Sequence, residues 1–308
     1  MARTSRRNRL LTDWLWADMR SRSATTILAL MIGLAILAPY AARYSPTAQG
    51  SLPFLGPSHA HWLGTDDLGR DVWARLVYGA RASLEAALIA VTVAVAIGVP
   101  VGLLAGWRGG WLDMALMRIV DTFLSFPGII LAIAITAVLG ASLVNSMVAV
   151  GIVFSPSIAR IMRGQVLVTR ERGYVDAALS FGSPPWRIVL RHIVPNAIQP
   201  VVIQVTFMLG LAVLAEASLS FVGLGVQYPA PSFGVMLRSA TQFTSINPNG
   251  VYPAGIAIAL LVLAFNALGD SLRDVLEPRA STRRRVKRAA RRGRRGTPSS
   301  ETTSDPAT

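Results

Sequence analysis

Long runs of residues without a charge dominate the hydrophobic pattern of this chain. Four of these runs cover residues 24–42, 86–107, 193–215 and 251–269, and a longer one covers residues 122–159. A helix needs about 20 apolar residues to cross the hydrocarbon core of a bilayer, so each shorter run predicts one transmembrane helix. The longer run would form a single helix of about 57 Å, nearly twice the thickness of the core. It therefore predicts a hairpin of two spans, which brings the number of spans to six.

The two arms of the hairpin are separated by residues that favour a helix end. Residues 140–142, Gly-Ala-Ser, mark the turn, and Asn145 opens the return helix. We expect the first arm to begin near Ala115 and the second to end near Met162. Pro127 lies within the first arm and should kink it, because proline lacks the N–H that a helix interior requires.

Residues 217–237 are also uncharged, but glycines and prolines interrupt them at positions 223, 225, 229, 231 and 234. We interpret this stretch as an ordered loop or a re-entrant segment, because broken backbone at membrane depth is tolerated only where protein or water satisfies it. The pattern as a whole predicts an all-α membrane protein with six transmembrane helices.

The positive charges predict the orientation of these helices. With both termini in the cytoplasm, 25 of the 30 Lys and Arg residues lie on the cytoplasmic side and five lie outside, as the positive-inside rule expects. The first outer loop carries four of those five, which runs against the rule. A cleaved signal peptide is the alternative for the first span, but residues 24–42 exceed the usual apolar region of about 7 to 15 residues.

Composition narrows the function classes. Hydrophobic residues make up 52% of the chain and charged residues only 15%, which excludes a disordered or fibrous protein. The chain has no cysteine, and its only lysine is Lys287, followed by Arg288. A phosphate-binding loop of the type GxxxxGK[ST] is therefore absent from the sequence. The chain is predicted not to be an enzyme, and any ATP hydrolysis would need another subunit.

Two basic segments flank the predicted spans. Residues 1–23 place apolar side chains on one helical face among arginines, which indicates either an interfacial segment or a short solvated helix. Residues 279–308 are polybasic and then rich in Ser, Thr and Pro, so we expect a disordered cytoplasmic tail. Such a tail favours anionic membrane lipids as its partner and orients the chain. A nucleic-acid role is the disfavoured alternative, since no nucleic-acid-binding motif accompanies the charges.

The predicted cytoplasmic loop of residues 160–195 contains two short helices. Residues 174–181 can form about two turns, and Gly182 is typical of the position just past a helix end. Ser183 would cap the second helix and Pro184 would begin it, while Pro195 would end it or bend it into the fifth span. Small side chains at residues 177 and 178 would let the first helix lie close to a partner.

This loop resembles the EAA loop of ABC importer permeases, EAA-x3-G-x9-I-x-L-P. The match runs through Asp176, Ala177 and Ala178 to Gly182 and on to Val194 and Pro195, with Asp in place of Glu and His192 at the Ile position. In that family a coupling helix in this loop docks on the ATPase subunit. The resemblance implies that the coupling residues here are Gly173, Tyr174, Val175, Asp176, Ala177, Ala178, Leu179 and Gly182.

Three further segments resemble the C-type permease of dipeptide, oligopeptide and nickel importers. They are residues 61–71, similar to HPLGTDxxGRD, residues 217–225, similar to ASLSFLGLG, and residues 269–278, similar to GDxLRDxLDP. Together the matches cover residues 24–278, which we expect to be the permease domain with the type I ABC importer permease fold. The resemblance implies a bacterial inner-membrane protein whose partners are a second permease in a heterodimer, two ATPases that bind ATP and Mg, and an extracytoplasmic solute-binding protein. It implies no nucleic acid and no cofactor bound by this chain.

Several polar residues within or beside the spans are candidates for a path or a gate. Glu216 should lie near the outer mouth, with a role in translocation or in a structural bond to the neighbouring loop. Asn266 could line a path or bond a neighbouring helix. For Asp121 we expect an intrahelical pair with Arg118. His59 and His61 lack a third ligand, so a metal site is not predicted.

The functional prediction is half of the translocation path of an ATP-driven peptide importer. Import of nickel or another small solute by the same architecture is an alternative. A secondary transporter is disfavoured, because that class shows buried ionisable coupling sites and inverted repeats, and the sequence shows no repeat.

Overall fold

The computed structural model describes residues 19–276, and this part of the chain is almost entirely helical. Residues 1–18 of the predicted interfacial segment and the predicted tail of residues 279–308 lie outside it. The β structure of the described residues is limited to an isolated bridge between Thr65 and Asp71. The all-α class is therefore confirmed for this part of the chain.

The helices follow one another along the chain with short connections, apart from one long outer segment between residues 42 and 71. In order they are α2 (Met19–Ile36), α3 (Ala38–Ala41), α4 (Val72–Arg108), α5 (Gly110–Ser125), α6 (Gly128–Leu139), α7 (Leu143–Arg170), α8 (Gly173–Ser180), α9 (Pro185–Ile188), α10 (Val194–Val222), α11 (Phe233–Gln242) and α12 (Tyr252–Leu276). A π-helical turn, Val189–Ile193, joins α9 to α10, and a 3-10 turn, Pro248–Val251, leads into α12.

Four helical segments among the described residues are long and apolar enough to cross a membrane. They are Val72–Arg108, Leu143–Arg170, Pro185–Val222 and Pro248–Leu276, and the bent pair of α5 and α6 makes a fifth if it counts as one span. The first expected span corresponds to a shorter apolar helix, Arg22–Ile36. It ends early because the chain breaks at Leu37 and Pro39 begins the short helix α3.

The predicted hairpin forms, but its first arm is broken. Phe126 is extended and Pro127 precedes α6, so α5 and α6 meet at 96°. The kink predicted at Pro127 is confirmed. The predicted boundaries are wrong by several residues, since α5 already begins at Gly110 and α7 continues to Arg170. Ser142 opens α7, because its hydroxyl accepts a hydrogen bond from the Asn145 N–H.

The stretch of residues 217–237 contains the expected loop, but the loop is shorter than expected and helices flank it on both sides. Helix α10 continues to Val222 and ends at Gly223, whose φ of +98° is left-handed and suits glycine. The loop that follows ends at Ser232, whose hydroxyl accepts a hydrogen bond from the Val235 N–H and caps α11. Only residues 223–232 are irregular.

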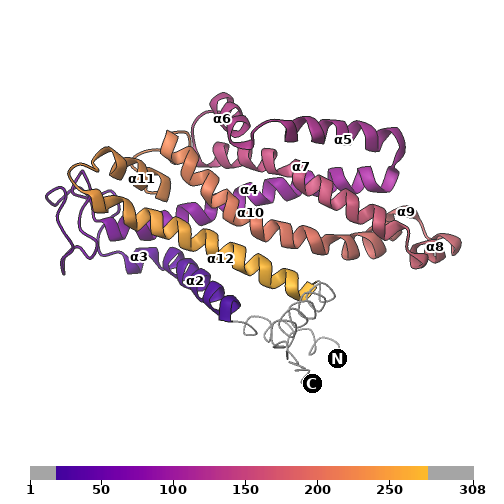
Figure 1. Cartoon of the computed structure of the whole chain (residues 1–308), viewed down its shortest axis with the longest axis horizontal. Helices are drawn as coiled ribbons and strands as arrows, with labels where there is room; N and C mark the ends of the chain where they lie inside the picture. Colours follow the sequence, from indigo (N-terminus) through magenta and orange to yellow (C-terminus); the bar gives the residue numbers. More distant parts are fainter. Residues whose placement is uncertain (1–18, 277–308) are drawn as a thin grey trace, which may run out of the picture.

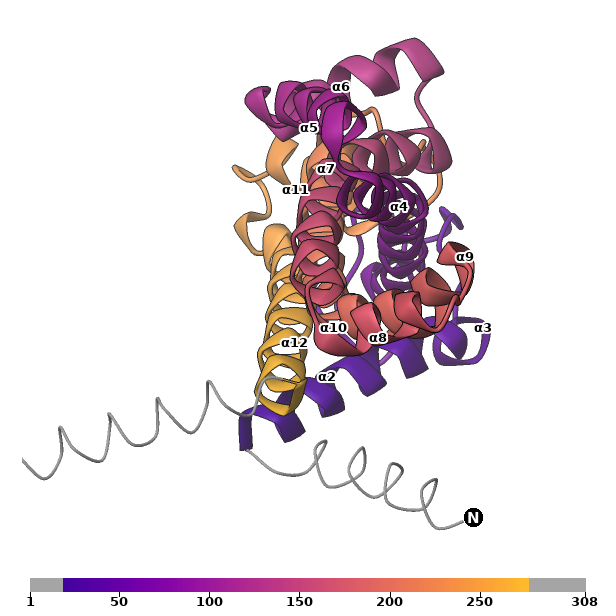
Figure 2. The same ribbon diagram turned by 90° about the vertical axis from the view of Figure 1, so that its right-hand side faces the viewer.

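Helices α4, α7 and α10 form the centre of the bundle, with α5 and α6 at one edge and α2 at the opposite edge (Figures 1 and 2). Glycines bring α4 and α7 together. A Cβ atom at Gly98 would lie 2.6 Å from the Ser155 carbonyl oxygen, and one at Gly151 would lie 2.6 Å from that of Ala90. Small residues commonly allow such close approach between membrane helices, because tight packing is a main source of their association.

Different segments of the chain lie at the two ends of the bundle. The outer segment of residues 42–71 and α11 lie at one end of the long axis, and α8 and α9 lie at the other (Figure 1). The start of α2 and the end of α12 both lie away from α11, but they do not reach as far along the long axis as α8 (Figure 1). The predicted coupling loop therefore lies at the opposite end of the bundle from residues 42–71.

Candidate functional site

Helix α8 carries the predicted coupling residues and ends in a Schellman motif. The Gly182 N–H donates to the Leu179 carbonyl, and the Ser183 N–H donates to the Ala178 carbonyl. Gly182 has a φ of +73°, a conformation that costs an L-residue about 1 to 2 kcal/mol. The predicted helix end at Gly182 is confirmed, and the motif fixes the corner between α8 and α9.

The second helix of the loop begins one residue later than predicted. Pro184 caps α9 and Pro185 is its first residue, so Ser183 does not cap it. Pro195 lies directly after the π-helical turn Val189–Ile193, in the first turn of α10, and does not end the helical segment there. Helix α9 continues through the π-helical turn into α10, so Pro185–Val222 forms a single helical segment.

One face of α8 is anchored and the other is open. Val175 is buried in the same apolar cluster as Ile188 and Ile193. Asp176, Ala177 and Leu179 are exposed. The ring of Tyr174 lies 6.2 Å from that of His192, so Tyr174 packs back onto the α10 side of the loop while remaining partly exposed. A protruding helix of this kind, with small and apolar side chains outward, can enter a groove on a partner.

Glu216 is fully buried where α10 meets α4 and the loop of residues 223–232. Its carboxylate accepts hydrogen bonds from the Ser83 hydroxyl on α4, at 2.8 Å, and from the Ser220 hydroxyl on α10, at 2.7 Å. The Ser220 hydroxyl in turn accepts from the Val226 N–H in the loop. Of the two roles left open by the sequence, these contacts favour the structural bond to the neighbouring loop.

We predict that Glu216→Ala lowers the amount of folded protein, whereas Glu216→Gln changes it little. Alanine leaves two buried hydroxyls without an acceptor, which costs about 1 to 3 kcal/mol each. Glutamine keeps an acceptor and nearly the same volume. Detergent-solubilised yield and thermal unfolding of the complex measure the difference. Equal stability of the two variants, with transport lost in both, would instead support a role in translocation.

Asn266 lies on α12 against α10. A Cβ atom at Gly210 would come within 3.6 Å of the Asn266 side-chain oxygen, and Asn266 is partly buried. This position suits contact between two helices better than an open path. Glu216 and Asn266 do not lie together in one site.

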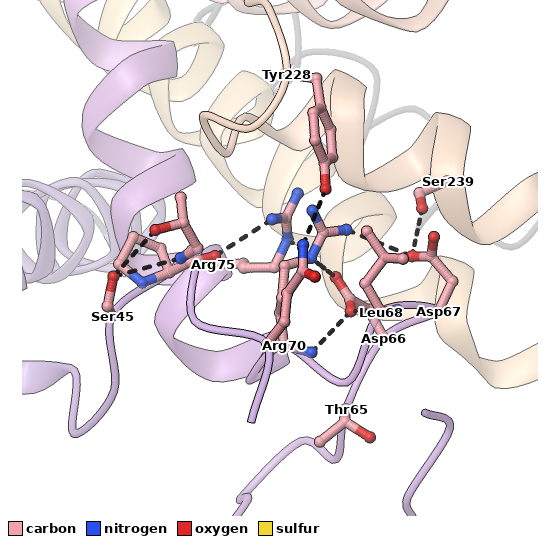
Figure 3. A network of polar contacts seen from close by, with 12 residues as sticks. Ser45, Thr65, Asp66, Asp67, Leu68, Arg70, Arg75, Tyr228 and Ser239 are labelled. Carbon is pink, nitrogen blue, oxygen red and sulfur yellow. Dashed lines mark hydrogen bonds and ion pairs between the residues drawn. The ribbon is translucent and has the colours of Figure 1, made fainter. Parts of the chain in front are cut away.

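A buried ionic network on the outer side was not predicted from the sequence (Figure 3). Asp66 is its centre: its carboxylate pairs with the Nε atoms of Arg70, at 2.6 Å, and of Arg75, at 3.3 Å. The same carboxylate accepts from the backbone N–H groups of Leu68 and Arg70. Both arginines are only 1% exposed. The sequence signal that could have indicated this network is the spacing of Asp66 and Asp67, four and three residues before Arg70.

The network ties the outer segment to the region around α11. Asp67 accepts a hydrogen bond from the Ser239 hydroxyl at 2.7 Å, and the Arg70 guanidinium lies 5.2 Å from the centre of the Tyr228 ring. The Tyr228 hydroxyl accepts from the Gln49 side chain. Two segments far apart in the sequence therefore form one outer cap. Beside it lies a mainly apolar cavity of about 680 Å³, with Asp66, Asp67 and Arg75 in its wall.

His61 takes part in a second buried cluster next to the start of α4. Its Nδ1 lies 2.9 Å from Asp71 Oδ1 and its Nε2 lies 2.9 Å from the Ser51 hydroxyl. The other Asp71 oxygen accepts from the Ala74 N–H and caps α4. Within residues 19–276 no group of three His, Cys, Asp or Glu side chains could hold a metal ion. His61 thus fixes the entry of the chain into α4.

The sequence pattern suggested that Asp121 pairs with Arg118. In the structure it pairs with Arg160 on α7 instead. Arg160 Nη2 donates to Asp121 Oδ1 at 2.6 Å. One helix turn from Arg160, Arg163 binds both carboxylate oxygens of Asp113 on α5. The expectation of an intrahelical pair is wrong because α5 lies along α7, so the long arginines of α7 reach its carboxylates. These pairs hold α5 against α7.

Comparison with known proteins agrees with this architecture. The model of the family "Binding-protein-dependent transport system inner membrane component" matches residues 98–282. The dipeptide transport system permease protein DppC of Alkalihalophilus pseudofirmus is 45% identical over 255 residues, which cover 82% of this chain and 84% of that protein. The glutathione transport system permease protein GsiD of Pectobacterium atrosepticum is 42% identical over 259 residues, covering 83% and 86%.

A solved structure shares the fold. One chain of the MetNI methionine ABC transporter, in an inward-facing conformation, matches with a TM-score of 0.54 and 26% identity, covering 65% of this chain and 96% of that one. The family match takes in helices α5 to α12 and the whole predicted coupling loop. This chain therefore belongs to the family of binding-protein-dependent transport system inner membrane components, the permeases of ABC importers.

Proposed function

We propose that this chain is one of two different permease subunits in an ATP-driven importer of short peptides. The observation that carries the proposal is the open face of α8, at the end of a permease of this family, in the loop that resembles the ATPase-docking loop. Two ATPase subunits would bind ATP and Mg and hydrolyse the ATP. A solute-binding protein would deliver the peptide from outside, and the complex would lie in the inner membrane of a bacterium.

The coupling role belongs to Gly173, Tyr174, Val175, Asp176, Ala177, Ala178, Leu179 and Gly182 in this proposal. The burial of Val175 and the hydrogen-bonded corner at Gly182 support this role. A coupling helix can transmit a movement of the ATPase only if it is fixed to the rest of the permease. Movement of the ATPases on binding ATP would then reach α10 directly, since α9 continues into it.

The proposed topology has six spans over residues 24–278, with both termini in the cytoplasm. The start of α2 and the end of α12 both lie on the side away from α11, which supports an even number of crossings between them (Figure 1). Helices α2 and α3 together would provide the first crossing, and α5 and α6 the third.

A short peptide is the proposed substrate class. The curated relatives named above carry names that specify dipeptide and glutathione, and glutathione is itself a modified tripeptide. The high identity over more than four fifths of this chain supports carrying the peptide class over. Nickel or another small solute is the alternative outcome of a transport assay.

Affinity purification of the tagged chain from gently solubilised membranes tests the proposed assembly. We expect a second, non-identical permease and ABC ATPase subunits to co-purify in a ratio of one to one to two. Recovery of the chain alone, or as a homodimer without ATPases, would contradict the assembly.

A further inference from the structure

The break between α5 and α6 leaves helix ends open in the middle of an apolar stretch. Every residue from 121 to 130 is exposed within the chain. Pro127 caps α6 without a side-chain acceptor, and the first intrahelical bonds of α6 are those from Ile130 and Leu131 to the Pro127 carbonyl. The N–H groups of Gly128 and Ile129 therefore precede the hydrogen-bonded part of the helix. They need a partner from outside the helix.

This break lies at membrane depth. Helix α5 begins beside the end of α4, on the side of the predicted coupling loop, and runs alongside α7 (Figure 1). Its residues, Gly110–Ser125, rise by about 24 Å at 1.5 Å per residue, against a hydrocarbon core of about 30 Å. If α5 starts at the membrane surface, the bend lies about 24 Å into the core and about 6 Å from its opposite surface.

Lipid does not provide the missing partners. Irregular backbone occurs at membrane depth only where protein buries it or where it lines a water-filled cavity. The chain itself does not bury this break, since the residues around it are exposed.

Charged groups beside the break indicate which of the two environments is present. In the ion pair of Asp121 with Arg160, the side chains are 59% and 56% exposed. Ionisable side chains within membrane segments almost always face a protein interior or a water-filled cavity. Asp121 lies one helix turn before Ser125, so this exposed pair and the open backbone are neighbours. Water would solvate both, whereas a dry protein interface would desolvate a pair that is only partly covered.

We propose that the α5–α6 break, with Asp121, Ser125 and Phe126 on α5 and Arg160 on α7, lines the water-filled path of the importer. This inference rests on the proposed function and places the path on the α5 side of α7. Glu216 and Asn266, the candidates suggested by the sequence, are buried or partly buried between helices and lie away from this surface. The open N–H groups of α6 and the ion pair give the path a polar wall within the hydrocarbon core.

The absence of cysteine from the sequence makes a direct test possible, because a single introduced thiol has no background within this chain. Ser125→Cys is nearly isosteric, and Phe126→Cys tests the neighbouring position. Leu263→Cys is the matched control: Leu263 is 63% exposed, compared with 56% for Phe126, but lies in the unbroken helix α12, about 17 Å from its start. Each variant is expressed with the full complex in membrane vesicles and treated with a charged methanethiosulfonate.

We expect Ser125→Cys and Phe126→Cys to be modified at least about tenfold faster than Leu263→Cys, because the reactive thiolate forms where water is present. Modification of both α5 positions only by a membrane-permeant maleimide, or at the slow rate of Leu263→Cys, would overturn the inference. Retained co-purification with the partners shows that each variant is assembled.

The labelling requires neither ATP nor a solute, so its failure is distinguishable from failure of the proposed function. If partners co-purify but the α5 thiols are inaccessible, the path lies elsewhere in an importer. If the thiols are accessible but no ATPase co-purifies, the chain has a water-filled path and the proposed ATP-driven assembly is wrong.

Discussion

Ala177→Arg should abolish ATP-driven uptake while leaving the permease folded in the membrane. Ala177 is exposed on the open face of α8, so arginine can be accommodated in the isolated chain. In the proposed groove of the ATPase, the same side chain would bury a charge without a partner, which costs about 2 to 5 kcal/mol. The expected result is a loss of ATPase co-purification of about 30-fold or more by the same arithmetic. Uptake assays and quantitative purification measure both effects.

Ala177→Ser is the matched control, because it adds a small polar atom and no charge. It should retain most of the uptake and of the bound ATPase. If Ala177→Arg retained ATPase binding and uptake like Ala177→Ser, the open face of α8 would not be the docking surface.

Asp66→Asn should unfold or strongly destabilise the outer cap. The change removes the carboxylate that pairs with both Arg70 and Arg75, which are 1% exposed, and leaves Asp67, 3.4 Å from Arg70, as the nearest remaining carboxylate. Removing one partner from a buried ion pair costs about 3 to 5 kcal/mol, because the remaining charge stays desolvated. This is a large share of the roughly 5 to 15 kcal/mol that stabilises a typical domain. Yield of assembled complex and thermal unfolding in detergent are the measurements.

Glu85→Gln is the matched control for this variant, since it also turns a carboxylate into an amide. Glu85 pairs with Arg81 on the surface of α4, where the two side chains are 52% and 54% exposed. An exposed pair contributes about 0 to 1 kcal/mol, so this variant should be close to the unmodified protein. Similar stability of Asp66→Asn and Glu85→Gln would show that the buried network does not hold the cap.

Local patterns in the sequence predicted most of the helices. The uncharged runs located the membrane-crossing segments, and Gly182 located the end of α8, because both signals depend on residues close together in the chain. Ser142 and Gly140 likewise marked the turn of the hairpin. The predicted helix boundaries were less accurate. Helix α7 continues past Arg163 to Arg170, because the guanidinium groups of both arginines find hydrogen-bond acceptors on other elements.

The contacts between distant segments could not be read from the sequence. Asp121 has Arg118 as its neighbour on the helix, yet it pairs with Arg160, which is 39 positions away. Pro127 predicted a kink, but the 96° bend requires α5 to be held along α7 by such pairs. The outer cap depends in the same way on Ser239, which lies 172 positions from Asp67.

Glu216 shows what sequence reasoning can and cannot decide about a buried polar residue. An ionisable side chain in an apolar run predicts polar partners around it. The hydrogen bonds of Glu216 with Ser83 and Ser220 confirm this prediction. Whether the environment is a path or a junction depends on its partners. The Ser83 hydroxyl, 133 positions away on α4, donates a hydrogen bond to the carboxylate and so makes Glu216 part of the contact between α4 and α10.

Reconstitution of transport tests the central claim most directly. The purified complex of this chain with its second permease and ATPases is placed in lipid vesicles, with the solute-binding protein and a labelled dipeptide on one side and ATP and Mg on the ATPase side. We predict peptide accumulation that stops when ATP or the binding protein is omitted, and that is absent from vesicles containing this chain alone. Accumulation by this chain alone, without ATP, would contradict the claim that it is a permease subunit of an ATP-driven importer.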